Sequence, residues 1–340
     1  MVQGVTSPRT VLAALAVMFT LGACASTPKA GTDAPAASRA RRPGVRAVLV
    51  LMPSSPSASA ALAGLEQEVG DELDVVARVV DGEPAADEVA RHVREVKPSA
   101  VVLMNNPSVR GWRAFQKLAS GEERALPAIG LMSSFLRETS TGIPQLGGVI
   151  YEVPLVTTLV NLRALLKQPV KRVGVVHRAA FRGYVGEQRE LIAPEGFELV
   201  GVEVPGQDPD ALVAAVTKLR TEAKVDVIWV LNDNALLDRG VLQRGWLPAL
   251  RGNKVPVVVN VGSLISRTVS FGTFGVLPDH KRLGAQAGAL VSGLAERGFA
   301  GVTPEFEYPV SVETVLDVDF ARKNLDLEER TLAKIDRLVE

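Results

Sequence analysis

Polar side chains that could bind a small molecule lie at matched places in the two halves of this chain. In the first half they are Ser54, Ser55, Asn105, Asn106, Ser133 and Ser134, and in the second half His177, Arg178, Asn232, Asp233 and Ser263. Hydroxyl groups, backbone N–H groups or Arg178 could bind a carboxylate, and Asp233 could bind an ammonium group. The set therefore suits a small zwitterion.

Helix capping is the alternative role for each of these residues, because Ser, Asn and Asp favour the position before a helix. Capping is the better interpretation for Ser57. Ligand contact is favoured for Asn232 and Asp233, since they follow a segment equivalent to the one that ends at Asn105.

Catalysis is not indicated by the sequence. It contains no Gly-x-Ser-x-Gly, no phosphate-binding loop that ends in Lys-Ser/Thr, and no His-Glu-x-x-His. The three histidines, at 92, 177 and 280, do not cluster. We therefore expect no enzymatic activity, no metal and no cofactor.

Short apolar segments rich in β-branched residues alternate with amphipathic segments. The predicted strands are 47–52, 73–80, 100–105, 127–132, 172–177, 197–204, 225–231 and 255–261. The predicted helices are 57–70, 85–96, 110–119, 183–193, 209–223 and 235–250. This alternation indicates βαβ units and parallel sheets.

The two halves repeat one plan, with Ala47 equivalent to Val173 and Asn105 equivalent to Asn232. The predicted fold class is α/β, with two similar lobes, each a parallel sheet flanked by helices, joined by a multi-strand hinge. Ligands of open parallel sheets bind beyond the carboxyl ends of the strands, where the polar residues named above lie. A duplicated unit without a shared cleft is the alternative.

The first residues have the pattern of a bacterial lipoprotein signal. Arg9 precedes a short apolar run at 11–21, and Gly22-Ala23 directly precede Cys24, the single cysteine of the chain. The run is shorter than the about 20 apolar residues that a spanning helix needs. We expect a signal peptide over 1–23, lipidation at Cys24, and a lipid-anchored protein of the cell envelope that faces the periplasm or the exterior. A chance cysteine behind a plain secretory signal is the alternative.

Residues 24–43 are rich in Ala, Ser, Pro and Thr and have no apolar periodicity, which predicts a flexible tether. The chain has 38 basic and 38 acidic residues, so no basic excess points to nucleic acid.

From about residue 46 to the C-terminus the chain resembles the tryptophan-binding-protein-like family of ABC transporter substrate-binding proteins, which have a type I periplasmic-binding fold. The matching segments are 146–149, 168–175, 231–234, 255–257, 269–276 and 316–325. The resemblance implies capture of a small polar solute, such as an amino acid, outside the cytoplasmic membrane and its delivery to the inner-membrane permease of an ABC-type importer. It also implies a monomer that closes about a hinge, with two segments facing the cleft, Asn232-Asp233-Asn234 and Ser133-Ser134.

The same fold predicts where the lobes begin and end. Lobe one is expected over 44–132 and 270–303, lobe two over 151–263 and 313–340, and the crossings over 133–150, 264–269 and 304–312. The sequence departs from the family at 132–137 and in the loop 53–57, both at the cleft wall. An envelope scaffold or activator without transport is therefore the second hypothesis, and a cleft blocked by Phe135, Phe271 or Phe274 would favour it.

Overall fold

The computed structural model describes residues 42, 44–266, 271–299 and 303–340. The predicted signal peptide over 1–23, Cys24, and all of the tether over 24–43 except Arg42 lie outside these residues. So do residues 267–269 of the predicted second crossing and the end of lobe one at 300–302. Within the described ranges, no helix has the length and apolar character needed to cross a membrane.

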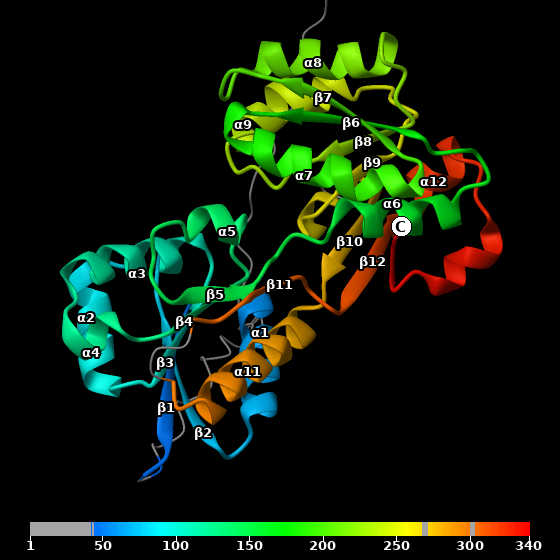
Figure 1. The fold of residues 1–340 in the computed structure, drawn as a ribbon. Coiled ribbons are helices and arrows are strands. Elements are labelled where there is room, and N and C mark those ends of the chain that lie inside the picture. The colour runs from blue at the N-terminus through cyan, green and yellow to red at the C-terminus, as the bar shows by residue number, and fades with distance from the viewer. Residues whose placement is uncertain (1–41, 43, 267–270, 300–302) are drawn as a thin grey trace, which may run out of the picture. The chain divides into compact units, whose positions relative to one another are not determined.

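Two separate sheets organise the described chain (Figure 1). The first has the order β11-β5-β4-β3-β1-β2 and the second β13-β12-β10-β9-β8-β6-β7. The strands of the first sheet are β1 (Arg46–Met52), β2 (Leu73–Val79), β3 (Ala100–Met104), β4 (Ala128–Leu131), β5 (Leu146–Val149) and β11 (Phe306–Glu307). Those of the second are β6 (Arg172–His177), β7 (Glu198–Glu203), β8 (Val227–Val230), β9 (Val257–Val259), β10 (Phe274–Pro278), β12 (Val312–Asp317) and β13 (Arg337–Val339).

The repeated plan is visible in the sheet topology. The first five strands of each sheet follow the same order, β2-β1-β3-β4-β5 and β7-β6-β8-β9-β10. Neighbouring strands are parallel except β10 and β12, which are antiparallel. The predicted fold class, two parallel-sheet α/β lobes with flanking helices, is confirmed. We call the first sheet with its helices lobe one, and the second sheet with its helices lobe two.

Lobe one buries both faces of its sheet, as the continuous apolar strands predict. Val48 and Val50 of β1 join one hydrophobic cluster, and Ala47 and Leu49 join the cluster on the opposite face. The helices of this lobe are α1 (Pro56–Val69), α2 (Ala86–Val96), α3 (Asn106–Leu118), α4 (Gly121–Arg124), α5 (Leu136–Thr139) and α11 (His280–Glu296). Figure 1 shows α1 and α11 on one face and α2 and α3 on the other.

Helix α11 packs on α1 at unusually short range. A Cβ atom at Gly64 would lie 1.9 Å from the carbonyl oxygen of Lys281, and one at Gly284 would lie 1.8 Å from that of Ala61. The absence of side chains at the two glycines therefore lets the helix backbones touch. This contact joins a helix from the C-terminal part of the chain to lobe one.

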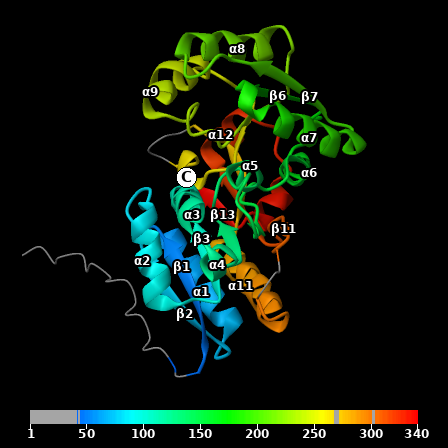
Figure 2. The same cartoon turned by 60° about the vertical axis from the view of Figure 1, so that its left-hand side comes forward.

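Lobe two repeats the two-faced core. Val227 and Trp229 of β8 point into one cluster, and Ile228 and Val230 into the other. Its helices are α6 (Leu155–Leu165), α7 (Arg182–Ile192), α8 (Pro209–Thr221), α9 (Arg239–Val241), α10 (Leu247–Ala249) and α12 (Val318–Asn324), with a π-helical turn at Leu242–Trp246. Figure 2 shows α8 and α7 on opposite sides of β6 and β7.

The connections between the lobes differ from the prediction at two points. The chain passes between the sheets at 150–154, at Asp279 and at 308–311 (Figure 1). The prediction placed 133–150 in a crossing, but β5 is a strand of the first sheet. It also placed 270–303 in lobe one, but β10 pairs with β9 and β12 in the second sheet. Long-range strand pairing decides sheet membership, and local periodicity does not report it.

Arg42 is bound to lobe one, although the prediction included it in the tether. Its backbone N–H and its Nε donate to the carboxylate of Asp74, both at 2.7 Å, and its Nη1 donates to Asp71 at 2.8 Å. The folded part therefore includes residue 42.

Candidate functional site

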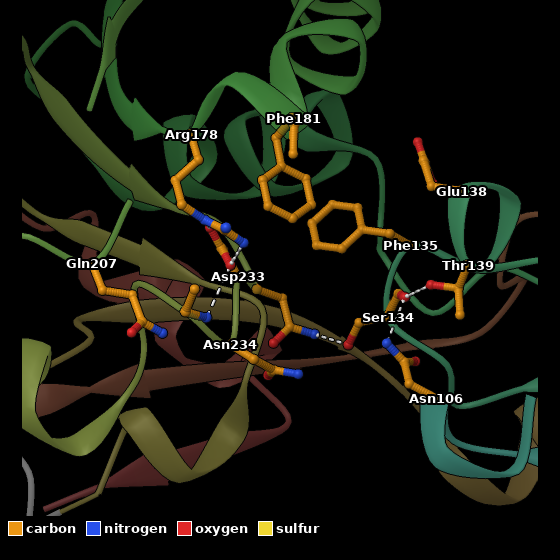
Figure 3. Close-up of a pocket in the computed structure, with 13 residues that line it drawn as sticks. Asn106, Ser134, Phe135, Glu138, Thr139, Arg178, Phe181, Gln207, Asp233 and Asn234 are labelled. Atoms are coloured by element: carbon orange, nitrogen blue, oxygen red, sulfur yellow. Dashed lines mark hydrogen bonds and ion pairs between the residues drawn. The ribbon is translucent and has the colours of Figure 1, made fainter. Parts of the chain in front are cut away.

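A cavity of about 520 Å³ lies between the carboxyl ends of strands from both lobes (Figure 3). Lobe one contributes loops after β3 and β4, and lobe two contributes loops after β6, β7 and β8. The lining residues are Asn106, Ser134, Phe135, Glu138, Thr139, Arg178, Ala180, Phe181, Gln207, Asn232, Asp233, Asn234 and Ala235. This is the place where the strand-end rule predicts a ligand.

A charged pair forms the lobe-two wall of the cavity. The Nε and Nη2 atoms of Arg178 donate to the two carboxylate oxygens of Asp233, each at 2.7 Å. The side chain of Asp233 is 2% exposed and that of Arg178 is 30% exposed. The hydrogen bonds to Asp233 raise the pKa of Arg178. Asp233 also accepts the N–H of Ala235 at 3.0 Å, so the first turn after β8 holds the carboxylate in place.

Amide and hydroxyl groups bridge the two lobes across the cavity floor. Asn232 of lobe two donates from Nδ2 to Ser134 Oγ of lobe one at 2.7 Å. Asn106 donates to the Ser134 carbonyl at 3.1 Å and accepts from Ser133 Oγ at 2.5 Å. The loops after β3 and β4 are thereby fixed to each other, and the loop after β8 is fixed to both.

Aromatic rings form the side of the cavity next to the charged pair. The rings of Phe135 and Phe181 lie 4.4 Å apart between centroids, and Tyr184 contacts Phe135 edge-on at 5.1 Å. Phe135 belongs to lobe one, yet it is 7% exposed and part of the hydrophobic core of lobe two. Its φ of +51° is in the left-handed region that L side chains rarely adopt. The Arg178 guanidinium lies 5.4 Å from the centre of the Phe181 ring.

Glu152 lies buried behind Phe135, in the crossing from β5 to α6. Its Oε1 accepts the N–H of Phe135 at 3.0 Å, and the residue is 3% exposed. Burial raises the pKa of Glu152 to about 7, against the effect of the Phe135 hydrogen bond. A carboxyl group with an ordinary pKa of 4.5 is thus brought into the neutral range.

Five of the predicted site residues line the cavity, and six do not. Those at the cavity are Asn106, Ser134, Arg178, Asn232 and Asp233. Ser55 and Asn105 instead cap helices, accepting the N–H groups of Ala58 at 3.1 Å and Ser108 at 2.9 Å. Ser133 is buried behind Asn106.

The other three predicted residues also lie away from the lining set. Ser54 is exposed in the loop before α1, and Ser263 is exposed in a 3₁₀ turn at Gly262–Leu264. The ring of His177 is buried, and its Nδ1 contacts the Arg178 carbonyl at 3.1 Å. Ser57 is the second residue of α1, and the residue that caps this helix is Ser55.

Asn234, which the resemblance placed at the cleft together with Asn232 and Asp233, also lines the cavity. Other lining residues were missing from the predicted site. Glu138 and Thr139 belong to α5, a four-residue helix too short for periodicity to show. Phe181 ends a 3₁₀ turn and Gln207 lies in the loop before α8, and neither has a distinguishing sequence signal.

Metal binding has no support in this region. Among the described residues, no group of three or more His, Cys, Asp or Glu side chains is placed to hold an ion. The cavity combines one guanidinium–carboxylate pair, several amides and two aromatic rings. Such a set can bind and orient a small polar molecule.

Comparison with known proteins shows the fold. No protein-family model matches the sequence, and no curated protein is significantly similar to it. A ligand-free, open structure of a substrate binding protein with adhesive properties from Clostridium difficile is 16% identical with a TM-score of 0.62, covering 87% of this chain and 99% of that one. An ABC domain in complex with L-Trp from Streptococcus pneumonia is 18% identical with a TM-score of 0.55, over 87% and 100% of the two chains. A periplasmic ribose ABC transporter structure from Conexibacter woesei is 18% identical with a TM-score of 0.50, over 82% and 94%. This chain therefore has the two-lobed, type I periplasmic-binding-protein-like α/β fold.

Proposed function

We propose that this protein is a lipid-anchored, extracytoplasmic solute-binding protein of an ABC-type importer. It works as a monomer without catalysing a reaction. It captures a small polar solute between its lobes, closes about the crossings, and presents the loaded form to an inner-membrane permease. The observation that carries the proposal is the polar cavity lined by strand ends of both lobes. A solute that contacts both walls stabilises the closed arrangement.

The charges around the cavity favour an amino acid or a similar zwitterion. The Nε and Nη2 atoms of Arg178 both donate to Asp233. Within the described residues its Nη1 makes no hydrogen bond, so Nη1 can donate to a ligand carboxylate. Glu138 of lobe one lines the cavity, is exposed, and has no ion pair among the described residues. We assign the ligand ammonium group to Glu138, since Asp233, which the sequence favoured, is already bound by Arg178.

The anchor and the transport system rest on the sequence. The segment that ends at Cys24 supports lipidation, and the resemblance to the tryptophan-binding-protein-like family supports an importer. A structurally similar protein holds L-Trp. The aromatic wall at Phe181 would suit a ligand with an apolar or aromatic side chain, so aromatic amino acids are the first solutes to test.

A thermal-shift screen with amino acids and nucleosides tests the proposal. A solute at 100 times its dissociation constant should stabilise the protein by about 2.7 kcal/mol. Arg178→Met should abolish the shift. Arg182→Met is the matched control, because Arg182 makes a similar two-pronged contact with Glu203 outside the cavity lining. Absence of a shift with every solute would reject the transport function.

One observation favours the second function, an envelope scaffold or activator without transport. Phe135 of lobe one fills part of the space between the lobes and packs into the core of lobe two. A scaffold needs a fixed relation between its lobes, and this contact could provide it. The two functions separate in the screen, because a scaffold shows no solute response while remaining folded.

A further inference from the structure

A buried carboxyl group and an aromatic ring join the two lobes beside the cavity. Phe135 follows β4 of lobe one, and its ring packs against Phe181 and Tyr184 of lobe two. Glu152 lies in the crossing from β5 to α6 and accepts the Phe135 N–H at 3.0 Å. We call Phe135 and Glu152 the latch, because the pair connects lobe one, lobe two and a crossing at one point (Figure 3 shows Phe135 beside Phe181).

Glu152 is poorly satisfied as a charged group. In the part of the chain that the structure describes, its Oε2 has no hydrogen-bond partner, and the residue is 3% exposed. An ionised carboxylate here would keep the backbone N–H groups of Phe135 and of Glu152 itself but would lose its water. The loss of water is the larger effect, so the uncharged form fits the site better.

We propose that protonation of Glu152 stabilises the contact of Phe135 with lobe two, and that loss of this proton releases it. When Phe135 leaves Phe181 and Tyr184, water reaches Glu152 and the carboxylate regains its hydration. A low pH therefore favours the arrangement in which Phe135 contacts lobe two, which we call the joined state. In the released state this contact is absent. The further consequence, tighter retention of solute at acidic pH, rests on the proposed function, whereas the latch itself does not.

The pH range follows from the two states of Glu152. In the joined state burial raises the pKa of Glu152 to about 7, and in water the ordinary value is 4.5. The ratio of joined to released molecules therefore falls progressively as pH rises from 4.5 to 7, and above pH 7 it changes little further. Between pH 5 and pH 8 the ratio of joined to released molecules should fall roughly 70-fold.

Other ionisable groups lie around the latch. Burial raises the pKa of Tyr151 and that of Tyr308 to about 12, and it raises the pKa of Tyr184 well above its ordinary value, so these three hydroxyl groups stay uncharged between pH 5 and pH 8. Arg137 of lobe one and Glu187 of lobe two form an ion pair at 3.4 Å.

Glu138 and His280 remain as competing groups. Glu138 is a like charge that acts on Glu152 from α5. His280 contacts Tyr151 at 3.0 Å, and burial lowers its pKa. Both need control variants.

Spin labels on opposite lobes can measure the contact without any solute. We would replace Cys24 by Ser and attach labels at Leu118→Cys in lobe one and Leu191→Cys in lobe two, which are 76% and 39% exposed. Pulsed electron paramagnetic resonance then gives the distance distribution at pH 5 and pH 8. Glu152→Gln removes the titration with little change of shape. Phe135→Leu weakens the aromatic contact, and Glu138→Gln and His280→Gln are the controls.

The expected result is a single short distance at pH 5 and a longer, broader distribution at pH 8. Glu152→Gln should keep the short distance at both pH values, Phe135→Leu should lengthen it at both, and His280→Gln should behave like the unchanged protein. Glu138→Gln removes a like charge that raises the pKa of Glu152, so its transition should move to lower pH. An unchanged distribution between pH 5 and pH 8 overturns the proposal, as does a pH response that survives Glu152→Gln or disappears in His280→Gln. If Glu152→Gln does not fold, a carboxyl carbon titration by nuclear magnetic resonance replaces it, and a Glu152 midpoint below pH 5 overturns the proposal. A failed solute screen would leave these outcomes unaffected.

Discussion

The ion pair between Arg178 and Asp233 should contribute far more to stability than a similar pair at the surface. Arg182 and Glu203 provide the comparison, since Arg182 donates from Nε and Nη2 to both carboxylate oxygens at 2.8–3.0 Å. The side chains of that pair are 71% and 38% exposed, against 30% and 2% for Arg178 and Asp233. Burial of one carboxylate is therefore the main difference between the two pairs.

The expected coupling energies follow from this difference. An exposed pair contributes about 0.2–1 kcal/mol, because water and salt screen it. Breaking a fully buried pair costs about 3–5 kcal/mol. Since Arg178 is partly exposed, we expect a coupling of about 2 kcal/mol between Arg178 and Asp233. Arg178→Met should be more destabilising than Asp233→Asn, because it leaves a buried carboxylate without its counter-ion.

Double-mutant cycles measured by urea unfolding test this reasoning. The first cycle combines Arg178→Met with Asp233→Asn, and the second combines Arg182→Met with Glu203→Gln. Equal coupling energies in the two cycles would refute the argument from burial.

Three further predictions concern single sites. Glu152 has a raised pKa in the folded protein, so the free energy of unfolding should fall by about 2–4 kcal/mol as pH rises from 4.5 to 7, and Glu152→Gln should remove that slope in urea unfolding. Gly284→Ala should lower the free energy of unfolding by more than about 3 kcal/mol in thermal unfolding, because its methyl group would lie 1.8 Å from a carbonyl oxygen of α1. Gly186→Ala is the control: this position in α7 has open space around it, and the change should stabilise the protein by about 0.5–1 kcal/mol. A neutral Gly284→Ala would contradict the close packing of α1 and α11. Ser134→Ala removes the 2.7 Å hydrogen bond from Asn232 and should cost about 1 kcal/mol in urea unfolding, and no change would mean that this bridge between the lobes is not formed in solution.

The fold class could be predicted from the sequence, but the boundaries of the two lobes could not. Continuous apolar strands such as β1 and β3 were identifiable because both of their faces are buried. The segment Leu146–Val149 was placed in a crossing, although it forms β5, a strand of only four residues with glycines at 147 and 148. In the structure a Cβ at Gly148 would lie 2.1 Å from the Gly130 carbonyl oxygen, so this glycine permits close approach of β5 to β4.

The candidate site was predictable by position but not by side chain. The strand-end rule found the loops, since Asn106, Ser134, Arg178 and Asn232 line the cavity. It could not separate Asn105 from Asn106, because one residue caps α3 and its neighbour faces the cavity. Which of two adjacent polar residues becomes the cap depends on the backbone, here a φ of +111° at Asn105. The pairing of Arg178 with Asp233 depends on contact between two loops 55 residues apart, which no local pattern encodes.

The bonds from Arg42 to Asp71 and Asp74 determine which lobe can be held still. Any pull exerted through the preceding residues is transmitted to the edge of the first sheet, at the start of β1 and β2. If the N-terminal side is attached to a surface, lobe one behaves as the stationary half and lobe two swings.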